Sequence, residues 1–336
     1  MENFEDADDA PSPALTLTVD EGFAGERLDK ALAQMIPDVS RSRLQQWIAA
    51  GAVRVNGAEV RARHELAFGD VLSIEPQPAP DAKASTPEAM PLDVVFEDDA
   101  ILVIDKPPGL VVHPAAGNWS GTLLNGLLAY APALMQIPRA GIVHRLDADT
   151  SGLMVVAKTL AAHTSLVRQL QARTVTREYW AIVLGVPAPR GVIDAAIGRD
   201  PRNPLRFKVS TAASAKPART HYARIATAEN EGAQISWLTC RLDTGRTHQI
   251  RVHLESIGHP LIGDPLYRKK LPAREEKGGW RAFERQALHA CRLSLDHPVT
   301  QRRMSWFREP APDLAQMMRS LGFGPLDKPS VALEEK

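Results

Sequence analysis

The stretch GIVHRLDADTSGLMVVAK, residues 141–158, decides the architecture of most of this chain. It places His144, Arg145 and Asp147 at the end of a short apolar run, and a polar turn then leads into a second apolar run typical of a strand. Charged side chains at the end of a strand face a cleft more often than they face a core. The stretch therefore predicts a functional site bordered by strands.

The acidic residues of this stretch are compatible with more than one interpretation. An aspartate in such a polar turn is most often a backbone cap, and this reading fits Asp147 or Asp149. Glycoside hydrolysis needs two carboxylates that flank one bond, whereas alternate residues point apart on an extended chain. A phosphotransfer motif of the DxDxT kind would need threonine where Ser151 stands. The sequence HQIRVH is no zinc motif, because the glutamate of HExxH is missing.

Outward from this stretch, the chain alternates strands and helices without a regular strand-helix-strand order. Apolar strand patterns occur in residues 92–107, which form two strands around an acidic turn, and in 177–185 and 234–242. Helical spacing is clear in residues 160–172 and again in Ile250, Leu254 and Ile257. The pattern predicts an α+β domain, in which helices flank a largely antiparallel mixed sheet.

The N-terminal part predicts a separate small unit. Apolar residues share one helical face over residues 28–35, and a second helix is expected between Ser40 as N-cap and Gly51 as C-terminal cap. Asn56-Gly57 is the favoured two-residue turn of a β-hairpin, and residues 71–75 form a further strand. Proline and the lack of large apolar side chains indicate that residues 76–91 are an extended linker. We therefore predict an acidic, disordered segment over 1–14, a small domain over 15–75, the linker over 76–91, a larger domain over 92–323 and a tail over 324–336.

Composition narrows the class of protein. The chain has 336 residues, 44% of them hydrophobic, and no run of eighteen apolar residues. An acidic N-terminus does not fit a signal peptide, and the two cysteines, Cys240 and Cys291, suit a reducing compartment. These features predict a cytoplasmic protein without a membrane partner.

Charge is balanced in total but segregated along the chain. With 40 basic and 40 acidic residues, the net charge of zero argues against an electrostatically driven nucleic-acid binder. Arginines nevertheless crowd residues 41–63, where the only acids are Glu59 and, just beyond, Glu65. Such a run is equally typical of a solvated surface and of phosphate contact. The candidate RNA-binding residues are Arg41, Arg43, Arg54, Arg61 and Arg63, and a second basic cluster runs from Arg199 to Arg224.

Three motifs, in order, carry a resemblance to a known family. HRLDADTSGL at 144–153, REYWAIV at 177–183 and GRTHQIRVHL at 245–254 resemble those of the RluA-type pseudouridine synthases, over roughly residues 92–310. The N-terminal unit resembles the S4 RNA-binding domain. This resemblance implies an isomerase, an intramolecular transferase, that forms pseudouridine in RNA without a metal or an organic cofactor.

Further motifs resemble one subgroup of that family. VVHPAAGNWSGTLLNGLL at 111–128, RAGIVHRLD at 139–147 and RQALHA at 285–290 are most similar to the D subgroup, which modifies large-subunit ribosomal RNA. The implied partner is 23S ribosomal RNA at the helix 69 stem-loop, with a flipped uridine, either as free RNA or in an assembling large subunit. A monomer with a role in ribosome biogenesis is expected. The D subgroup often has lysine where this chain has Ala148, which puts a contact beside the site in doubt.

The resemblance also implies a role for individual residues. Asp147 is the expected nucleophile, and the sequence leaves open whether it attacks C1′ of the ribose or removes a C2′ proton. Arg251 is expected to keep that carboxylate ionised. Tyr179 is expected to stack on the target base and to help remove its C5 proton, and Arg145 to fill the gap left by the flipped base. His144 has no assigned role beyond orienting the loop backbone, and His248 and His253 are treated with the same caution.

Two other classes of function remain as alternatives. In a non-catalytic RNA-binding protein, the S4-like unit would bind RNA and the larger domain would be an inactive relic, for which we would expect the loss of Asp147, Tyr179 or Arg251. All three are present. A hydrolase that releases the base would need a second carboxylate to activate water, and the sequence offers none at a suitable spacing.

Overall fold

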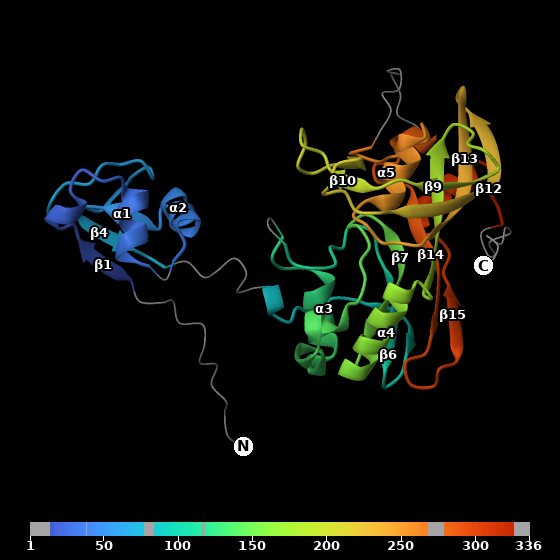
Figure 1. Cartoon of the computed structure of the whole chain (residues 1–336), viewed down its shortest axis with the longest axis horizontal. Coiled ribbons are helices and arrows are strands. Elements are labelled where there is room, and N and C mark those ends of the chain that lie inside the picture. Colours follow the sequence, from blue (N-terminus) through green and yellow to red (C-terminus); the bar gives the residue numbers. More distant parts are fainter. Residues whose placement is uncertain (1–13, 38, 77–83, 116–117, 268–278, 326–336) are drawn as a thin grey trace. The chain divides into compact units, whose positions relative to one another are not determined.

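A computed structural model describes residues 14–37, 39–76, 84–115, 118–267 and 279–325 (Figure 1). The predictions for the acidic N-terminus, for most of the linker's first half and for nearly all of the tail fall outside these ranges. The chain divides into two compact units, residues 1–82 and 83–336, and the division lies within the proline-rich stretch. Each unit has its own core. Among the described residues, no helix is both long enough and apolar enough to cross a lipid bilayer.

The small unit packs two helices on a four-stranded antiparallel sheet. Both predicted helices are present, and apolar side chains from their inner faces, such as Leu28 and Leu44, are fully buried. At the predicted hairpin turn, Asn56 and Gly57 have φ values of 51° and 81°, the left-handed conformation of a type I′ turn. The elements are β1 (Leu15–Thr18), α1 (Leu28–Met35), α2 (Arg41–Ala49), β2 (Val53–Val55), β3 (Ala58–Glu59) and β4 (Val71–Ile74), with strand order β1-β4-β2-β3.

The larger unit is built on one nine-stranded sheet, and the prediction of a mixed, largely antiparallel sheet is confirmed. All its strand pairs are antiparallel except β7 with β14. The order is β5-β6-β7-β14-β8-β13-β12-β9, and β15 pairs with β14. Its strands are β5 (Asp93–Glu97), β6 (Ile101–Lys106), β7 (Ser151–Ala157), β8 (Thr176–Leu184), β9 (Arg190–Asp194), β12 (Arg219–Asn230), β13 (Ala233–Leu242), β14 (Leu288–Asp296) and β15 (Arg303–Phe307), and a separate hairpin joins β10 (Ile197–Arg199) to β11 (Phe207–Val209).

Helices cover both faces of this sheet. The face that carries Tyr179 packs against α3 and α5, and the opposite face packs against α4 and α6. Ile250 and Leu254 of α5 are buried as predicted, whereas Ile257 lies just beyond the end of the helix and is 38% exposed. The helices are α3 (Leu123–Tyr130), α4 (Leu160–Ala172), α5 (Gln249–Ser256) and α6 (Pro312–Ser320).

Strand β14 lies between β7 and β8 and brings together two parts of the chain that line one pocket. At the crossing, Gly152 of β7 has a φ of 117° and faces the backbone of β14. A Cβ atom at this position would lie 2.4 Å from the carbonyl oxygen of Ala290. Only glycine therefore allows this close approach.

The second half of the predicted linker is held by the larger unit. The side chain of Asn125, on α3, donates a hydrogen bond to the carbonyl oxygen of Thr86 at 2.8 Å, and the Glu88 carboxylate accepts one from the Gly121 amide at 2.8 Å. Met90 packs over Gly126 so closely that a side chain at 126 would collide with it. Few large apolar residues are needed here, because two hydrogen bonds and the Met90 side chain make these contacts.

Candidate active site

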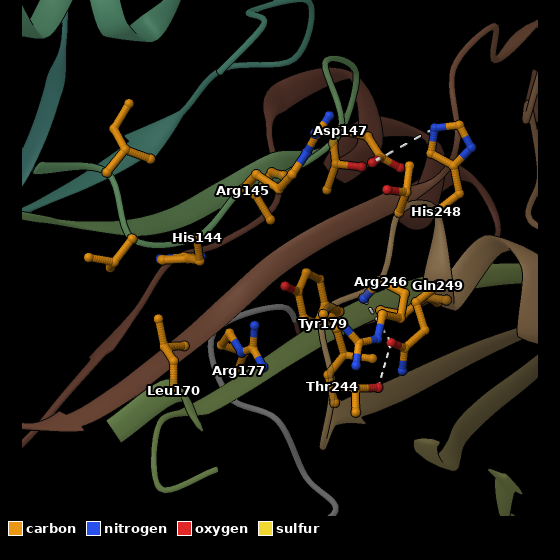
Figure 2. Close-up of a pocket in the computed structure, with 18 of the residues that line it drawn as sticks. His144, Arg145, Asp147, Leu170, Arg177, Tyr179, Thr244, Arg246, His248 and Gln249 are labelled. Carbon is orange, nitrogen blue, oxygen red and sulfur yellow. Dashed lines mark hydrogen bonds and ion pairs between the residues drawn. The ribbon is translucent and has the colours of Figure 1, made fainter. Parts of the chain in front are cut away.

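A pocket of about 820 Å³ lies in the larger unit (Figure 2). Its wall comes from the loop before β7, from β8 and from the segment that leads into α5. Asp147, Tyr179 and Arg251 all line it, although each belongs to a different motif. The structure thus brings the three predicted catalytic residues into one cavity.

The loop that carries Asp147 is fixed through its backbone. The carbonyl oxygen of Ala148 accepts hydrogen bonds from Lys106 Nζ at 2.7 Å and from the Gly109 amide at 3.0 Å. The Thr150 amide donates to the carbonyl oxygen of Asp147 at 3.0 Å and closes the turn. Lys106 is fully buried, and burial lowers its pKa to about 7. Contacts from the end of β6 therefore set the position of the Asp147 backbone.

Arg251, at the start of α5, joins two carboxylates. Its Nη1 donates to Asp147 Oδ2 at 3.0 Å, while Nε and Nη2 donate to Asp264 at 2.7 and 2.9 Å. The ring of Tyr267 lies 5.0 Å from the guanidinium. Burial opposes the charge of Arg251, but Asp264 and Asp147 outweigh it and raise its pKa above the ordinary value. Arg251 therefore stays cationic in a nearly dry position.

The two oxygens of Asp147 have different surroundings. Oδ2 is held by Arg251, whereas Oδ1 accepts no hydrogen bond from any described residue. His248 Nε2 lies 4.0 Å from Oδ1, too far for a hydrogen bond, and Figure 2 marks this pair. The side chain of Asp147 is 16% exposed. One oxygen is thus fixed and the other is available for chemistry.

A neutral histidine faces that available oxygen. The Tyr267 hydroxyl accepts a hydrogen bond from the Phe207 amide at 2.8 Å. It also lies 2.9 Å from His248 Nδ1, so it can donate its own proton to that nitrogen. In that tautomer the imidazole proton lies on Nε2, toward Asp147. Burial lowers the pKa of His248, which keeps the ring neutral at neutral pH.

Tyr179 lies on β8 and is 5% exposed. Burial raises the pKa of its phenol, which therefore keeps its proton. Among the described residues, the hydroxyl makes no hydrogen bond. Its ring packs in the core beside the pocket, and its hydroxyl is thus uncommitted at the wall.

Other residues of the HRLD and HQIRVH motifs lie at or near the pocket. Arg145 lines the pocket and is exposed, whereas His144 and His253 bind backbone groups or a neighbouring side chain. His144 Nε2 accepts a hydrogen bond from the amide of Val155 at 3.1 Å. Burial lowers the pKa of His144 to about 3. His253 contacts the Thr220 hydroxyl and a carbonyl oxygen at 2.8 and 2.9 Å. His144 therefore binds the backbone of β7, whereas a contact with the loop backbone was predicted, and His253 is structural.

Comparison with known proteins places this site in a family. A family model described as RNA pseudouridylate synthase matches residues 100–256, and an S4 domain model matches residues 26–72. A ribosomal large subunit pseudouridine synthase D from Nitrosomonas europaea is 47% identical over 319 residues, which cover 94% of this chain and 91% of that protein. The chain belongs to the RNA pseudouridylate synthase family.

Two further proteins support this placement of the pseudouridine synthase. A protein of the same name from Neisseria meningitidis serogroup A is 51% identical over 300 residues, covering 88% of this chain and 79% of that protein. The solved structure of human RNA Pseudouridylate Synthase Domain Containing 1 has a TM-score of 0.52 and 25% identity, and covers 71% of this chain and 97% of that one. The predictions of the family, of the S4-like domain, of the mixed-sheet fold and of an RNA-modifying isomerase are confirmed.

The S4-like unit of this pseudouridine synthase does not present all five predicted arginines in the same way. The prediction overlooked Asp29, whose fully buried carboxylate binds Arg41 Nη2 at 2.8 Å. Burial opposes ionisation of Asp29, yet hydrogen bonds from Arg41, Gln45 and Arg27 lower its pKa to about 2. Arg41 is thus engaged within the protein. Of the other four, Arg54 lies 4.0 Å from Glu59, Arg43 stacks on Trp47, and Arg61 and Arg63 are exposed.

Several residues of the site were not predicted from the sequence. Asp264 and Tyr267 support Arg251, and Lys106 anchors the loop, but none of them lies in a motif that the resemblance assigned. The one available signal for Asp264 is the preceding Gly263, which indicates a turn. Its φ of 72° confirms this turn, and the Asp264 carboxylate also accepts the amides of Leu266 and Tyr267. Within the described ranges, no group of three or more acidic, histidine or cysteine side chains is arranged to hold a metal ion.

Proposed function

We propose that this pseudouridine synthase isomerises specific uridines of large-subunit (23S) ribosomal RNA, with Asp147 as the reacting group. The substrate class is supported by the names of the relatives, which are ribosomal large subunit enzymes. The observation that carries the catalytic role is the asymmetry of Asp147. One oxygen is tied to a buried cation, and the other accepts no hydrogen bond from any residue that the structure describes.

The geometry suits a rearrangement that needs no oxidant or reductant. The N1–C1′ bond of uridine breaks, the uracil turns, a C5–C1′ bond forms, and the proton on C5 is lost while N1 gains one. Asp147 Oδ1 starts this sequence either by attacking C1′ or by removing a C2′ proton. Arg251 serves both routes, because an ion pair in a dry site favours the charged carboxylate.

The remaining residues of the pocket recognise the target nucleotide in this proposal. The flipped base stacks on Tyr179, whose free hydroxyl can reach a polar edge of the uracil or assist in removal of the C5 proton. Arg145, exposed two residues before Asp147, enters the gap that the base leaves in the RNA. The S4-like unit positions RNA without taking part in the chemistry.

Within large-subunit RNA, we propose the helix 69 stem-loop as the substrate, either free or in an assembling subunit, and a cytoplasmic monomer as the active form. A non-catalytic RNA-binding protein is the competing function. It does not account for the hydrogen-bonded network of Asp147, Arg251 and Asp264. Burial of such charges lowers the stability of the fold, so a protein without catalytic function has no reason to retain them.

Mapping of pseudouridine in ribosomal RNA from cells with and without the gene tests this proposal. We expect loss of the gene to remove pseudouridines from the helix 69 loop only, and the wild-type gene to restore them. Loss at other large-subunit sites would contradict the helix 69 assignment. An unchanged map would contradict the enzymatic function on this RNA.

The role of Asp147 is tested with purified protein. Asp147→Asn keeps the shape of the side chain and removes the reacting anion, so we expect no product and RNA affinity within about tenfold of wild type. Asp149→Asn is the matched control, since this neighbouring carboxylate does not line the pocket, and it should remain active. Turnover by Asp147→Asn would contradict the mechanism.

A further inference from the structure

Arg177 lines the active-site pocket and is partly buried. It precedes Tyr179 by two residues on β8, so both side chains project from the same face of the sheet. Figure 2 shows Arg177 between Leu170 and Tyr179, at the end of the pocket away from His248. The two β8 positions are about 7 Å apart along the strand, a distance that one nucleotide can span.

The charge of Arg177 is not balanced by the described part of the chain. No described carboxylate lies within 4.0 Å of it, and its buried Nε has no hydrogen-bond partner there. The adjacent acid, Glu178, projects to the other face and pairs with Arg292 at 3.2 Å. Arg177 as a whole is only partly buried, but a cation that has lost part of its water is normally paired, because loss of water is costly for a charge. Arg177 therefore has capacity for an anion from outside.

The surroundings of Arg177 favour an anion and offer no competitor. Gly245 leaves space for the guanidinium, since a Cβ atom there would lie 3.0 Å from Nη1. His144 is neutral, because burial and then the charge of Arg177 lower its pKa to about 3. Neither acid among the lining residues pairs with Arg177: Asp147 binds Arg251 through Oδ2, and Asp243 lies 3.0 Å from His221.

A strand of RNA is the anion that fits this position. The pocket is larger than one uracil needs, and its lining holds further arginines that could follow a phosphate backbone. Guanidinium groups bind phosphate oxygens through two parallel hydrogen bonds and so fix orientation as well as position. The other arginines in the lining, besides Arg251, are Arg139, Arg145, Arg173 and Arg246.

We propose that Arg177 binds a backbone phosphate next to the target uridine and thereby holds the flipped nucleotide against Tyr179 and Asp147. This inference rests on the proposed function, because it takes RNA as the substrate. It assigns Arg177 to substrate binding, separate from Arg251, whose charge is used within the protein.

The first test measures RNA affinity against salt concentration for full-length protein. The probe is the helix 69 stem-loop transcript, and pseudouridine formation by wild-type protein is measured on the same RNA. We expect Arg177→Gln to weaken binding about tenfold and to reduce the magnitude of the log-affinity against log-salt slope by ~0.7 to 0.9, the value for one phosphate. Arg177→Lys should keep the slope, because it keeps the charge. Arg168→Gln, an exposed arginine of α4 outside this pocket, should behave as wild type.

The second test identifies the phosphate. Transcripts carry a neutral methylphosphonate at one position at a time on either side of the target uridine. One replacement should weaken binding to wild-type protein and have no further effect on Arg177→Gln, so that the two losses are not additive. Additive losses at every flanking position, or an unchanged salt slope in a variant that melts like wild type, would overturn the assignment. If wild-type protein forms no pseudouridine in the transcript, the proposed substrate fails, while the salt slopes still decide whether Arg177 contacts phosphate.

Discussion

Asp264 accepts two parallel hydrogen bonds from Arg251, one from Nε at 2.7 Å and one from Nη2 at 2.9 Å. The pair is almost completely buried, with the side chains 0% and 4% exposed. A two-point contact fixes the plane of the guanidinium, so the direction of the remaining Nη1 toward Asp147 is determined by Asp264. Asp264 is therefore expected to act on the reaction through Arg251, without touching RNA.

Asp264→Asn tests this relationship. The amide keeps the shape but removes the charge, and breaking a buried pair costs about 3–5 kcal/mol of unfolding free energy. A tilted guanidinium should also lower kcat by about 100-fold, with little change in KM. Asp313→Asn is the matched control, because Asp313 accepts a similar pair of bonds from Arg285 but is 47% exposed. It should cost less than about 1 kcal/mol. Equal losses of stability and activity in both variants would contradict the special role of Asp264.

Arg251→Met is expected to lower activity severely. Without the guanidinium, Asp147 Oδ2 loses the hydrogen bond that fixes the carboxylate, and the buried Asp264 loses its cation. The measurement is the rate of pseudouridine formation at saturating RNA for the variant beside wild type. Unchanged activity would mean that another cation pairs with Asp147.

Stability should fall as the solution is acidified, in part because of His289. Its ring contacts Ser151 at 3.0 Å and a carbonyl oxygen at 3.2 Å, and burial lowers its pKa from 6.5 to about 4. The unfolded chain therefore binds the proton first, so the contribution of this histidine is complete above pH 6.5 and is lost as the pH falls toward 4. The unfolding free energy is measured with denaturant at pH 7 and at pH 4. Between these pH values, it should fall by up to about 3 kcal/mol less in His289→Gln than in wild type. An equal loss in the variant would show that other groups govern acid unfolding.

Removal of residues 1–82 should separate RNA affinity from chemistry. If about two of the exposed arginines each neutralise one phosphate, the magnitude of the log-affinity against log-salt slope should fall by ~1.4. The rate at saturating RNA should be retained, because Asp147, Tyr179 and Arg251 belong to the larger unit. Removal of residues 1–91 is the comparison, since it also deletes the contacts of Thr86 and Glu88 with the α3 region and should lower the melting temperature. An unchanged salt slope, or a folded 83–336 fragment without activity, would contradict this division.

The sequence predicts those parts of the fold in which local pattern and environment agree. Residues 160–172 form α4 and residues 151–157 form β7, since the apolar spacing of each fits its burial. The long strand β12 was not predicted: its threonines, alanines and charged residues give a weak signal, and β9 and β13 pair with it from either side. Pairing between distant segments is not visible in a local window.

The residues of the candidate site also divide into those that the sequence predicts and those that only the tertiary structure shows. The sequence predicts Asp147, Tyr179 and Arg251 because each lies in a recognisable motif. Asp264 and His248 matter through their distances to those residues, and such distances arise only from tertiary structure. Arg41 shows the converse, because its neighbours in sequence are not acidic and its partner Asp29 lies twelve residues away, on another helix.

The position of β14 has a consequence for the timing of synthesis. The loop with Asp147 precedes β7 and Tyr179 lies on β8, yet these two strands are joined through residues 288–296, which leave the ribosome well after Arg251. A nascent chain can thus hold every reacting group and still lack the spacer that sets their separation. Contacts of such long sequence separation form late and slowly. The growing polypeptide should therefore have no RNA-modifying activity until its C-terminal portion has been translated. The late synthesis of β14 thus delays the onset of activity.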